Sequence, residues 1–250
     1  MAGVVRLLLW NIQYRRRDSP HDRMLREIID SHSPDLICLT EGHGDFLESD
    51  HTITSEADYG YPLRPARRKV LLWSRSPWKQ VDTKGWDTLP SGCFVAGTTA
   101  TPIGSLRFLG VCVPWDEAHV TSGRRDRKKW EDHTAYLHGL ANIVSCEEHG
   151  ERMVVLGDYN QQVPRKREPV EVAKALEKVL VQGLHLATSG IIPGVERPSI
   201  DHVAHTSDLE AVRVQGLSNR SPNGAAMSDH LGLVVELQQR SANIGVSLGP

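Results

Sequence analysis

Apolar and polar residues alternate along the chain in two rhythms, one typical of strands and one typical of helices. Near the N-terminus a β-rich apolar run, Val4–Ile12, is followed by a stretch with helical spacing, His21–His32. Pro34 ends that helix, and Asp35–Glu41 is typical of a buried strand. We expect Gly42–Lys69, which is rich in Gly, Pro and charged residues, to form surface loops.

The rest of the chain predicts more strands than helices. Amphipathic helices are expected at Arg125–His149 and Val170–Leu180. Strands are expected over Val70–Arg75, Cys93–Thr101, Ser105–Val113, Arg152–Leu156, Gly183–Thr188, Ser199–His205, Glu210–Gln215 and Leu231–Leu237. With no internal repeat and no linker, this order predicts one α/β domain of mixed sheets over residues 1–237, followed by a flexible tail over residues 238–250.

Composition limits the classes of protein to consider. The 250 residues are 39% hydrophobic and 24% charged, with a net charge of −2, so the overall charge does not indicate a nucleic-acid-binding protein. Four cysteines lack C-x-x-C spacing, and three lie in strand-like runs, which favours a reduced protein without disulfides. No signal peptide and no membrane-spanning run is recognisable, so a soluble cytoplasmic protein is expected. No motif indicates a protein partner.

Polar side chains stand at the ends of several predicted strands. Asn11 and Glu41 end the first two strands, Asp158 and Asn160 follow the strand Arg152–Leu156, and Ser228–His230 precedes the last strand. If the last strand runs antiparallel to the other three, these groups meet at one edge of the sheets. Each residue alone has an ordinary explanation as a turn, cap or loop residue.

Taken in order, these motifs resemble one known family. They are W-N (Trp10–Asn11), P-D-L-I-C-L-T-E (Pro34–Glu41), G-D-Y-N (Gly157–Asn160), S-I-D-H-V (Ser199–Val203) and S-D-H (Ser228–His230). The chain resembles the endonuclease/exonuclease/phosphatase family from Trp10 to about Leu237. The resemblance implies a DNase I-like α/β fold, in which two packed mixed β-sheets are flanked by helices as a four-layer sandwich.

The resemblance also implies which residues of the site bind metal and which are catalytic. Metal ligands correspond to Glu41, Asn11 and Asp229, and catalytic residues correspond to Asp158, Asn160, Asp201 and His230. Mg²⁺ is the expected cofactor, with Mn²⁺ as a substitute, because carboxylate and amide oxygens suit these ions. Asp158 would orient or deprotonate the attacking water, and Asn160 would hold that water or a phosphate oxygen. His230, paired with Asp201, would donate to the phosphate oxygens.

One part of the family pattern is absent. Many members carry a central His, and the apurinic endonucleases carry a Tyr where this chain has Cys112, in V-C-V-P-W (Val111–Trp115). His119 is a candidate replacement, the alternative being a surface-loop histidine. Gln13 stands where some members use a carboxylate, which reduces one metal contact to an amide.

Three basic clusters occur along the chain. They are Arg64–Lys69, Arg124–Lys129 and Arg165–Arg167. Such runs are usually solvated surface. The second cluster follows the V-P-W loop and the third, with Arg165 and Lys166, follows Asn160 closely, so these two are candidates for phosphate binding. Trp115 would either stack on a base or ring of the substrate or shield the core, and His119 lies in the same loop.

The leading functional hypothesis is metal-dependent hydrolysis of phosphate esters, most simply as a nuclease or phosphodiesterase. The second keeps the fold but acts on a phosphomonoester, a phosphoinositide or a phospholipid headgroup. The third is a catalytically silent binding module. The complete set of acidic and histidine residues argues against the third, because binding alone does not require it.

Overall fold

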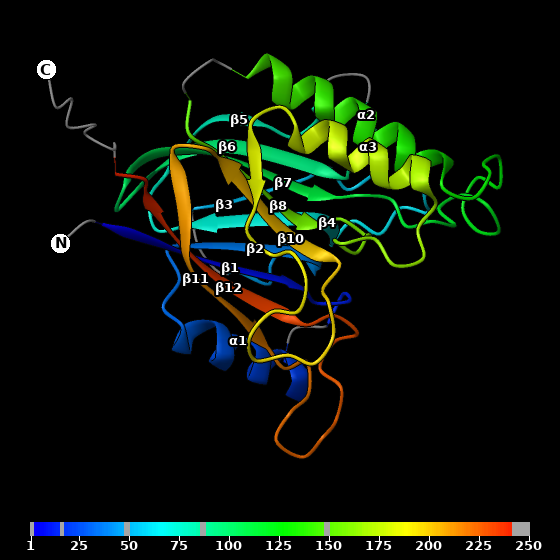
Figure 1. The fold of residues 1–250 in the computed structure, drawn as a ribbon. Coiled ribbons are helices and arrows are strands. Elements are labelled where there is room, and N and C mark those ends of the chain that lie inside the picture. Colours follow the sequence, from blue (N-terminus) through cyan, green and yellow to red (C-terminus); the bar gives the residue numbers. More distant parts are fainter. Residues whose placement is uncertain (1–2, 16–17, 48–50, 86–88, 148–150, 242–250) are drawn as a thin grey trace, which may run out of the picture.

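Two six-stranded β-sheets face each other in the computed structural model, with helices on their outer faces (Figure 1). The structure describes residues 3–15, 18–47, 51–85, 89–147 and 151–241. Helix α1 (Pro20–Ser31) covers one sheet, and helices α2 (Glu131–Cys146) and α3 (Val170–Leu180) cover the other. The predicted fold class is therefore confirmed.

The first sheet has the strand order β11-β12-β1-β2-β4-β3, and the second has the order β5-β6-β7-β8-β10-β9. The strands of the first sheet are β1 (Val4–Asn11), β2 (Leu36–His43), β3 (Thr52–Thr54), β4 (Arg67–Ser74), β11 (Leu209–Leu217) and β12 (Gly232–Gln239). The strands of the second are β5 (Trp78–Asp82), β6 (Phe94–Thr101), β7 (Gly104–Cys112), β8 (Met153–Asp158), β9 (Leu184–Leu186) and β10 (Asp201–Thr206).

Strand direction brings the polar residues at the strand ends to one end of the molecule. In the first sheet β1 runs parallel to β2 and antiparallel to β12, as the sequence argument required. In the second sheet β8 runs parallel to β7 and antiparallel to β10. The C-terminal ends of β1, β2 and β8 and the N-terminal ends of β10 and β12 therefore carry the candidate residues.

Apolar side chains from the two sheets form the central core. Leu7 and Leu9 of β1 and Leu233 of β12 pack with Phe108 of β7 and Leu156 of β8, and all five are buried. Two further apolar clusters lie between the sheets and the helices. Burial of this kind supplies most of the stabilisation of a fold that has so few helices.

Edge strands account for the main errors in the predicted elements. The stretch Gly42–Lys69, expected to be loops, contains β3 and the beginning of β4. Strand β5 was not predicted at all. Both missed strands lie at sheet edges, and neither has a fully buried residue, so their sequences lack the apolar pattern that identifies a strand.

One helix and one strand have different ends from those predicted. The helix expected from Arg125 begins at Glu131, because Trp130 has a left-handed backbone and donates its N–H to the Asp116 carbonyl. Strand β12 runs to Gln239, two residues into the predicted tail, because β1 and β11 pair with it on both sides. The rest of that tail, residues 242–250, and the predicted helix end at 148–149 lie outside the described residues.

The cysteines and the helices bear on two smaller expectations. Cys38, Cys93 and Cys112 are buried among the strands, as their apolar surroundings predicted. None of the helices in the described part of the chain has the length and apolar character that a membrane crossing requires.

The glycine of the G-D-Y-N motif is required by the close approach of two strands. Gly157 has a φ of +148°, and a Cβ at this position would lie 1.9 Å from the Val111 carbonyl oxygen on β7. We expect Gly157→Ala to lower the free energy of unfolding by roughly 3 kcal/mol. Gly183→Ala is the control, because Gly183 has a φ of +93° but no atom within 4 Å of the added Cβ, so backbone strain alone applies. Denaturant unfolding of both variants measures the difference, and equal losses would contradict the steric argument.

Candidate active site

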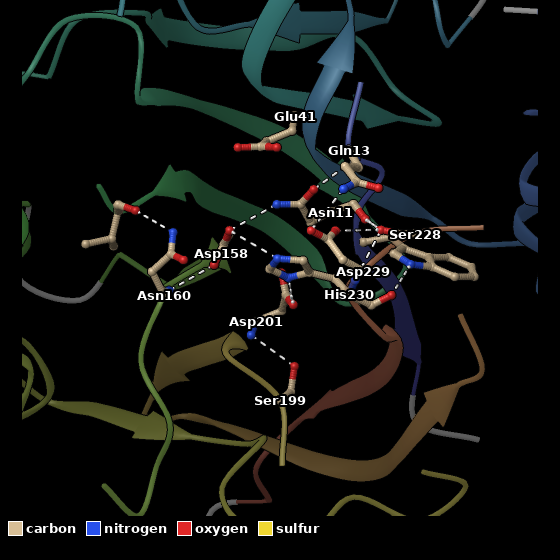
Figure 2. Close-up of polar contacts among 12 residues, drawn as sticks. Asn11, Gln13, Glu41, Asp158, Asn160, Ser199, Asp201, Ser228, Asp229 and His230 are labelled. Atoms are coloured by element: carbon tan, nitrogen blue, oxygen red, sulfur yellow. Dashed lines mark hydrogen bonds and ion pairs between the residues drawn. The ribbon is translucent and has the colours of Figure 1, made fainter. Parts of the chain in front are cut away.

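A cavity of about 510 Å³ opens where the strand ends of the two sheets meet. The inner strands supply most of its floor, and the loops before β4 and after β7 supply its walls. Of the residues predicted for the site, those that line this cavity are Asn11, Glu41, Trp115, His119, Asp158, Asn160, Asp229 and His230. Asp201 lies directly behind His230, to which it is hydrogen bonded (Figure 2).

Asn11 and Asp158 connect the two sheets at the base of the cavity. Asn11 Nδ2 donates to Asp158 Oδ2 over 3.0 Å, and each residue is only 2% exposed. Asn11 Oδ1 accepts from the backbone N–H of Gln13 at 3.0 Å, which fixes the orientation of the amide. The contact therefore positions the Asp158 carboxyl group relative to the first sheet.

His230 lies between two buried carboxyl groups. Its Nδ1 is 2.7 Å from Asp201 Oδ2, and its Nε2 is 4.0 Å from Asp158 Oδ2. Burial would lower the pKa of His230, but the charge and hydrogen bond of Asp201, with the charges of Asp158 and Asp229, raise it to about 10. The imidazole is therefore cationic at neutral pH, with Nδ1–H donating to Asp201.

Asp158 is held at the boundary between its two protonation states. Burial and the negative charge of Asp201 raise the pKa of Asp158 to about 7, while His230 and the N–H of Asn160 oppose this rise. The Asn160 N–H donates to Asp158 Oδ1 at 2.9 Å, and Asn160 Nδ2 donates to the Val113 carbonyl at 2.8 Å. A carboxyl group in this state can take up a proton at neutral pH.

Three further side chains with oxygen donors line the cavity, Asn11, Glu41 and Asp229. Figure 2 shows Asn11 in the centre of the site, with Glu41 above it and Asp229 below it, next to His230. Asp229 Oδ2 accepts from Gln13 Nε2 at 3.1 Å, and Glu41 Oε1 accepts from Lys69 Nζ at 2.6 Å. Two carboxylates and an amide oxygen are the donor set that a hard divalent cation prefers.

A second group of ligand atoms is less suited to a cation. One atom each from Asp158, Asp201 and His230 lie within 4.8 Å of one another. A protonated His230 has no free lone pair, however, and both of its nitrogens face carboxylates. The backbone of Glu41, by contrast, has a φ of +51°, a strained conformation that typically persists at functional sites.

Two predicted substrate-binding residues lie elsewhere. Arg165 and Lys166 do not line the cavity, because their loop turns back around Glu168. Arg165 donates to the Glu168 carbonyl, and the N–H groups of Lys166 and Arg167 donate to the Glu168 carboxylate at 2.8 and 2.9 Å. The proximity of these residues to Asn160 in sequence therefore does not bring them to the site.

The two other predicted substrate-binding residues do reach the cavity. Trp115 is 42% exposed at its wall. His119 is buried and stacks on Tyr61, with ring centroids 4.4 Å apart. Cys112, where the family resemblance led us to expect His or Tyr, lines the cavity, and burial raises the pKa of its thiol well above the usual range.

The segment expected to be loops supplies several cavity residues that the sequence argument missed. Tyr59 and Tyr61 come from this segment, and Arg67 and Lys69 lie on the same face of β4. The available signal was the alternation in R-R-K-V-L-L-W, where basic residues precede a strand-like run. Tyr14, two residues after Ile12, is also part of the wall.

Two buried histidines support the loops that carry Trp115 and Asn160. His133 of α2 lies 2.8 Å from the Pro114 carbonyl through Nδ1 and 3.2 Å from Gln161 Oε1 through Nε2. His202 of β10 contacts the Gln161 carbonyl through Nε2 at 2.9 Å. Burial lowers the pKa of both histidines, so both are neutral at neutral pH.

Comparison with known proteins agrees with this geometry. A model of the Endonuclease/Exonuclease/phosphatase family matches residues 8–230. A search of curated proteins finds no match.

Solved structures share the fold at low sequence identity. An endonuclease/exonuclease/phosphatase from Beutenbergia cavernae DSM 12333 has a TM-score of 0.69 and 18% identity, over 96% of this chain and 72% of that chain. The 3′ phosphatase NExo from Neisseria, bound to a product DNA hairpin, has a TM-score of 0.68 and 17% identity, over 92% of this chain and 98% of that chain. An AP endonuclease from Archaeoglobus fulgidus has a TM-score of 0.67 and 15% identity, over 92% and 98%.

The charge on His230 gives a measurable pH dependence. Because the pKa of His230 rises from 6.5 to about 10 on folding, its contribution to stability is fully present below pH 6.5 and is lost as the pH rises through about 10. Asp201→Asn removes the main charge that opposes burial, so the pKa of His230 in the metal-free protein should fall by several units. NMR titration of the imidazole measures it. Asp30→Asn, on the exposed face of α1, is the control, and an unchanged titration in Asp201→Asn would contradict the assignment.

Proposed function

Since this chain belongs to the endonuclease/exonuclease/phosphatase family, whose members hydrolyse phosphoester bonds, we propose that it is a metal-dependent hydrolase of phosphodiester bonds. The observation that supports the proposal most directly is the arrangement around Asp158. A carboxyl group with a pKa of about 7 lies 4.0 Å from a cationic imidazole, beside an oxygen-rich group of possible metal ligands.

In this proposal Asp158 acts as the general base. It accepts a proton from the attacking water, while Asn11 holds the carboxyl group in place through their hydrogen bond. Asn160, whose backbone N–H is fixed on Asp158, positions the water or a phosphate oxygen. A binding module would not need a carboxyl group with so large a rise in pKa, and this argues against the silent alternative.

His230 stabilises the negative charge that develops on the phosphate. Its Nε2–H donates to a non-bridging oxygen, while Nδ1–H remains bonded to Asp201. Asp201 does not reach the substrate in this proposal. It holds the ring orientation and the positive charge of His230, in the way that a carboxylate supports a catalytic histidine.

Mg²⁺, or Mn²⁺ in its place, fits the oxygen donors of Glu41, Asn11 and Asp229. When bound, the ion supplies positive charge to the phosphoryl oxygens and the leaving oxygen. Lys69, 2.6 Å from Glu41 Oε1, fixes the Glu41 carboxylate and adds a further positive charge at the cavity wall.

Nucleic acid is the substrate class that the related structures favour. The TDP2 of D. rerio was solved with a single-stranded DNA product, and NExo with a DNA hairpin. The phosphatase name of NExo keeps phosphomonoester hydrolysis as the second candidate. The three buried cysteines support action in a reducing compartment such as the cytoplasm.

Substitution of the proposed base and acid tests their roles. We expect Asp158→Asn and His230→Ala each to lower turnover by roughly 10²–10⁴-fold while the protein stays folded, because each removes a proton-transfer or charge-stabilising group. Asp30→Asn and His138→Ala change the same residue types at exposed helix positions and should keep full turnover. Near-normal turnover in either site variant would contradict the assignment.

Metal removal tests the cofactor. The test uses a panel of plasmid, abasic DNA, RNA, cyclic dinucleotide, phosphoinositide and generic bis-phosphoester substrates. Whatever activity the protein shows on this panel should disappear with a chelator and return with Mg²⁺ or Mn²⁺. Glu41→Gln should raise the Mg²⁺ concentration for half-maximal activity at least as much as the roughly 10–100-fold caused by loss of an outer-shell contact. Glu27→Gln on α1 is the matched control. Activity that survives chelation would contradict the metal proposal.

A further inference from the structure

Two guanidinium groups at the cavity have no acidic partner among the residues that the structure describes. Several other charged groups of its wall are paired: Glu41 with Lys69, Asp158 with His230, and Asp132 with Arg124 and Arg127. The Asp229 carboxylate accepts a hydrogen bond from the Gln13 amide. Arg64 and Arg67 also line the cavity, and among the described residues no carboxylate lies within ion-pair distance of either one. Unpaired guanidinium groups at a cavity wall are typical of a site for an anion.

A tight turn places the two arginines side by side at the start of β4. The Arg67 N–H donates to the Arg64 carbonyl over 2.8 Å, so the four residues form a β-turn with Pro65 at its favoured second position. The turn brings the two backbones close together, and both side chains contribute to the same wall. Forked guanidinium donors that line one cavity are suited to binding phosphate oxygens.

The ring of Tyr14 holds Arg67 in place without neutralising its charge. Its guanidinium carbon lies 4.3 Å from the centre of the Tyr14 ring, a cation–π contact that preserves the positive charge. Tyr14 is itself part of the cavity wall. Arg67 is therefore positioned in advance, which lowers the entropy that binding an anion would cost.

The position of Arg67 along β4 relates this pair to the reaction centre. Arg67 and Lys69 lie on the same face of the strand, about 7 Å apart along it. Lys69 is the residue bound to Glu41, the proposed metal ligand. The spacing is close to that between consecutive phosphates of an extended nucleotide strand.

We propose that Arg64 and Arg67 form a second anion subsite, which binds a substrate phosphate adjacent to the one that is cleaved. This inference rests on the proposed function, because that function places the cleaved phosphate beside Glu41. The exposed ring of Trp115 at the same cavity offers a stacking surface for a base. The preferred substrate is thus a nucleotide diester that carries a further phosphate, either free or within a strand.

Paired chromogenic substrates test the subsite. Thymidine 5′-(p-nitrophenyl phosphate) and its 3′-phosphorylated form contain the same reacting diester and differ only in the additional phosphate. We expect kcat/KM of the unsubstituted protein to be at least about ten-fold higher for the 3′-phosphorylated form, because charge-assisted contacts to phosphate are strong. In Arg67→Ala and in the Arg64→Ala/Arg67→Ala variant this ratio should fall towards one.

Arg23→Ala is the matched control. Arg23 is exposed on α1 and does not line the cavity, so the ratio should remain unchanged in this variant. Arg67→Lys keeps a positive charge but loses the forked donor, and an intermediate ratio is expected. An equal ratio in Arg67→Ala and Arg23→Ala would overturn the subsite.

A binding measurement separates this proposal from the proposed function. Calorimetry with the Asp158→Asn protein compares thymidine 3′,5′-bisphosphate with thymidine 5′-monophosphate, and a preference for the bisphosphate that Arg67→Ala abolishes supports the subsite without turnover. That preference in a protein that hydrolyses no phosphodiester would contradict the proposed function alone. Competition by the dinucleotide pdTpdT and by a longer single strand identifies free nucleotides or nucleic acid as the source, and competition by neither contradicts the subsite.

Discussion

The hydrogen bond between Asn11 and Asp158 is the contact on which the site depends, because it joins the ends of two strands from different sheets. Face-to-face packing of apolar side chains brings the sheets together, but it does not fix the strand ends to within a hydrogen-bond length. At 3.0 Å, in a place where both side chains are buried, this bond does so. It also adds a second hydrogen bond, beside that of the Asn160 N–H, to a carboxyl group that is only 2% exposed.

Three buried ionisable groups next to this hydrogen bond carry charges that compensate one another. Asp201, His230 and Asp158 alternate in sign when Asp158 is ionised, and each is largely removed from solvent. Burying a cation between two carboxylates costs less free energy than burying any one of these three charges without a partner. Asp158 carries the weakest compensation, since Asp201 repels it while His230 attracts it. The protein thereby keeps one of its buried acids available for proton transfer at neutral pH.

Much of the site could be predicted from the sequence, because strand-end residues of inner strands are set by strand direction alone. Asn11, Glu41 and Asp158 follow strongly apolar runs, and the resemblance to the family indicated the pairing of Asp201 with His230. The loops could not be predicted in the same way. Nothing in the sequence reveals that Glu168 draws its loop away from the cavity, since that depends on hydrogen bonds to backbone N–H groups. The edge strands were missed for a related reason, because a strand with a solvent-exposed side has little apolar pattern.

The place of β4 in its sheet has a consequence for how such an enzyme can change. The side chains proposed to react lie at the ends of β1, β2, β8 and β10 and directly before β12. The turn of Arg64 and Arg67, by contrast, begins β4, beside the short edge strand β3. A loop next to a sheet edge can lengthen, shorten or exchange residues without shifting the inner strands. Substrate preference and chemical competence can therefore diverge independently in evolution, and a designer could graft a new recognition loop at this edge while leaving the chemistry untouched.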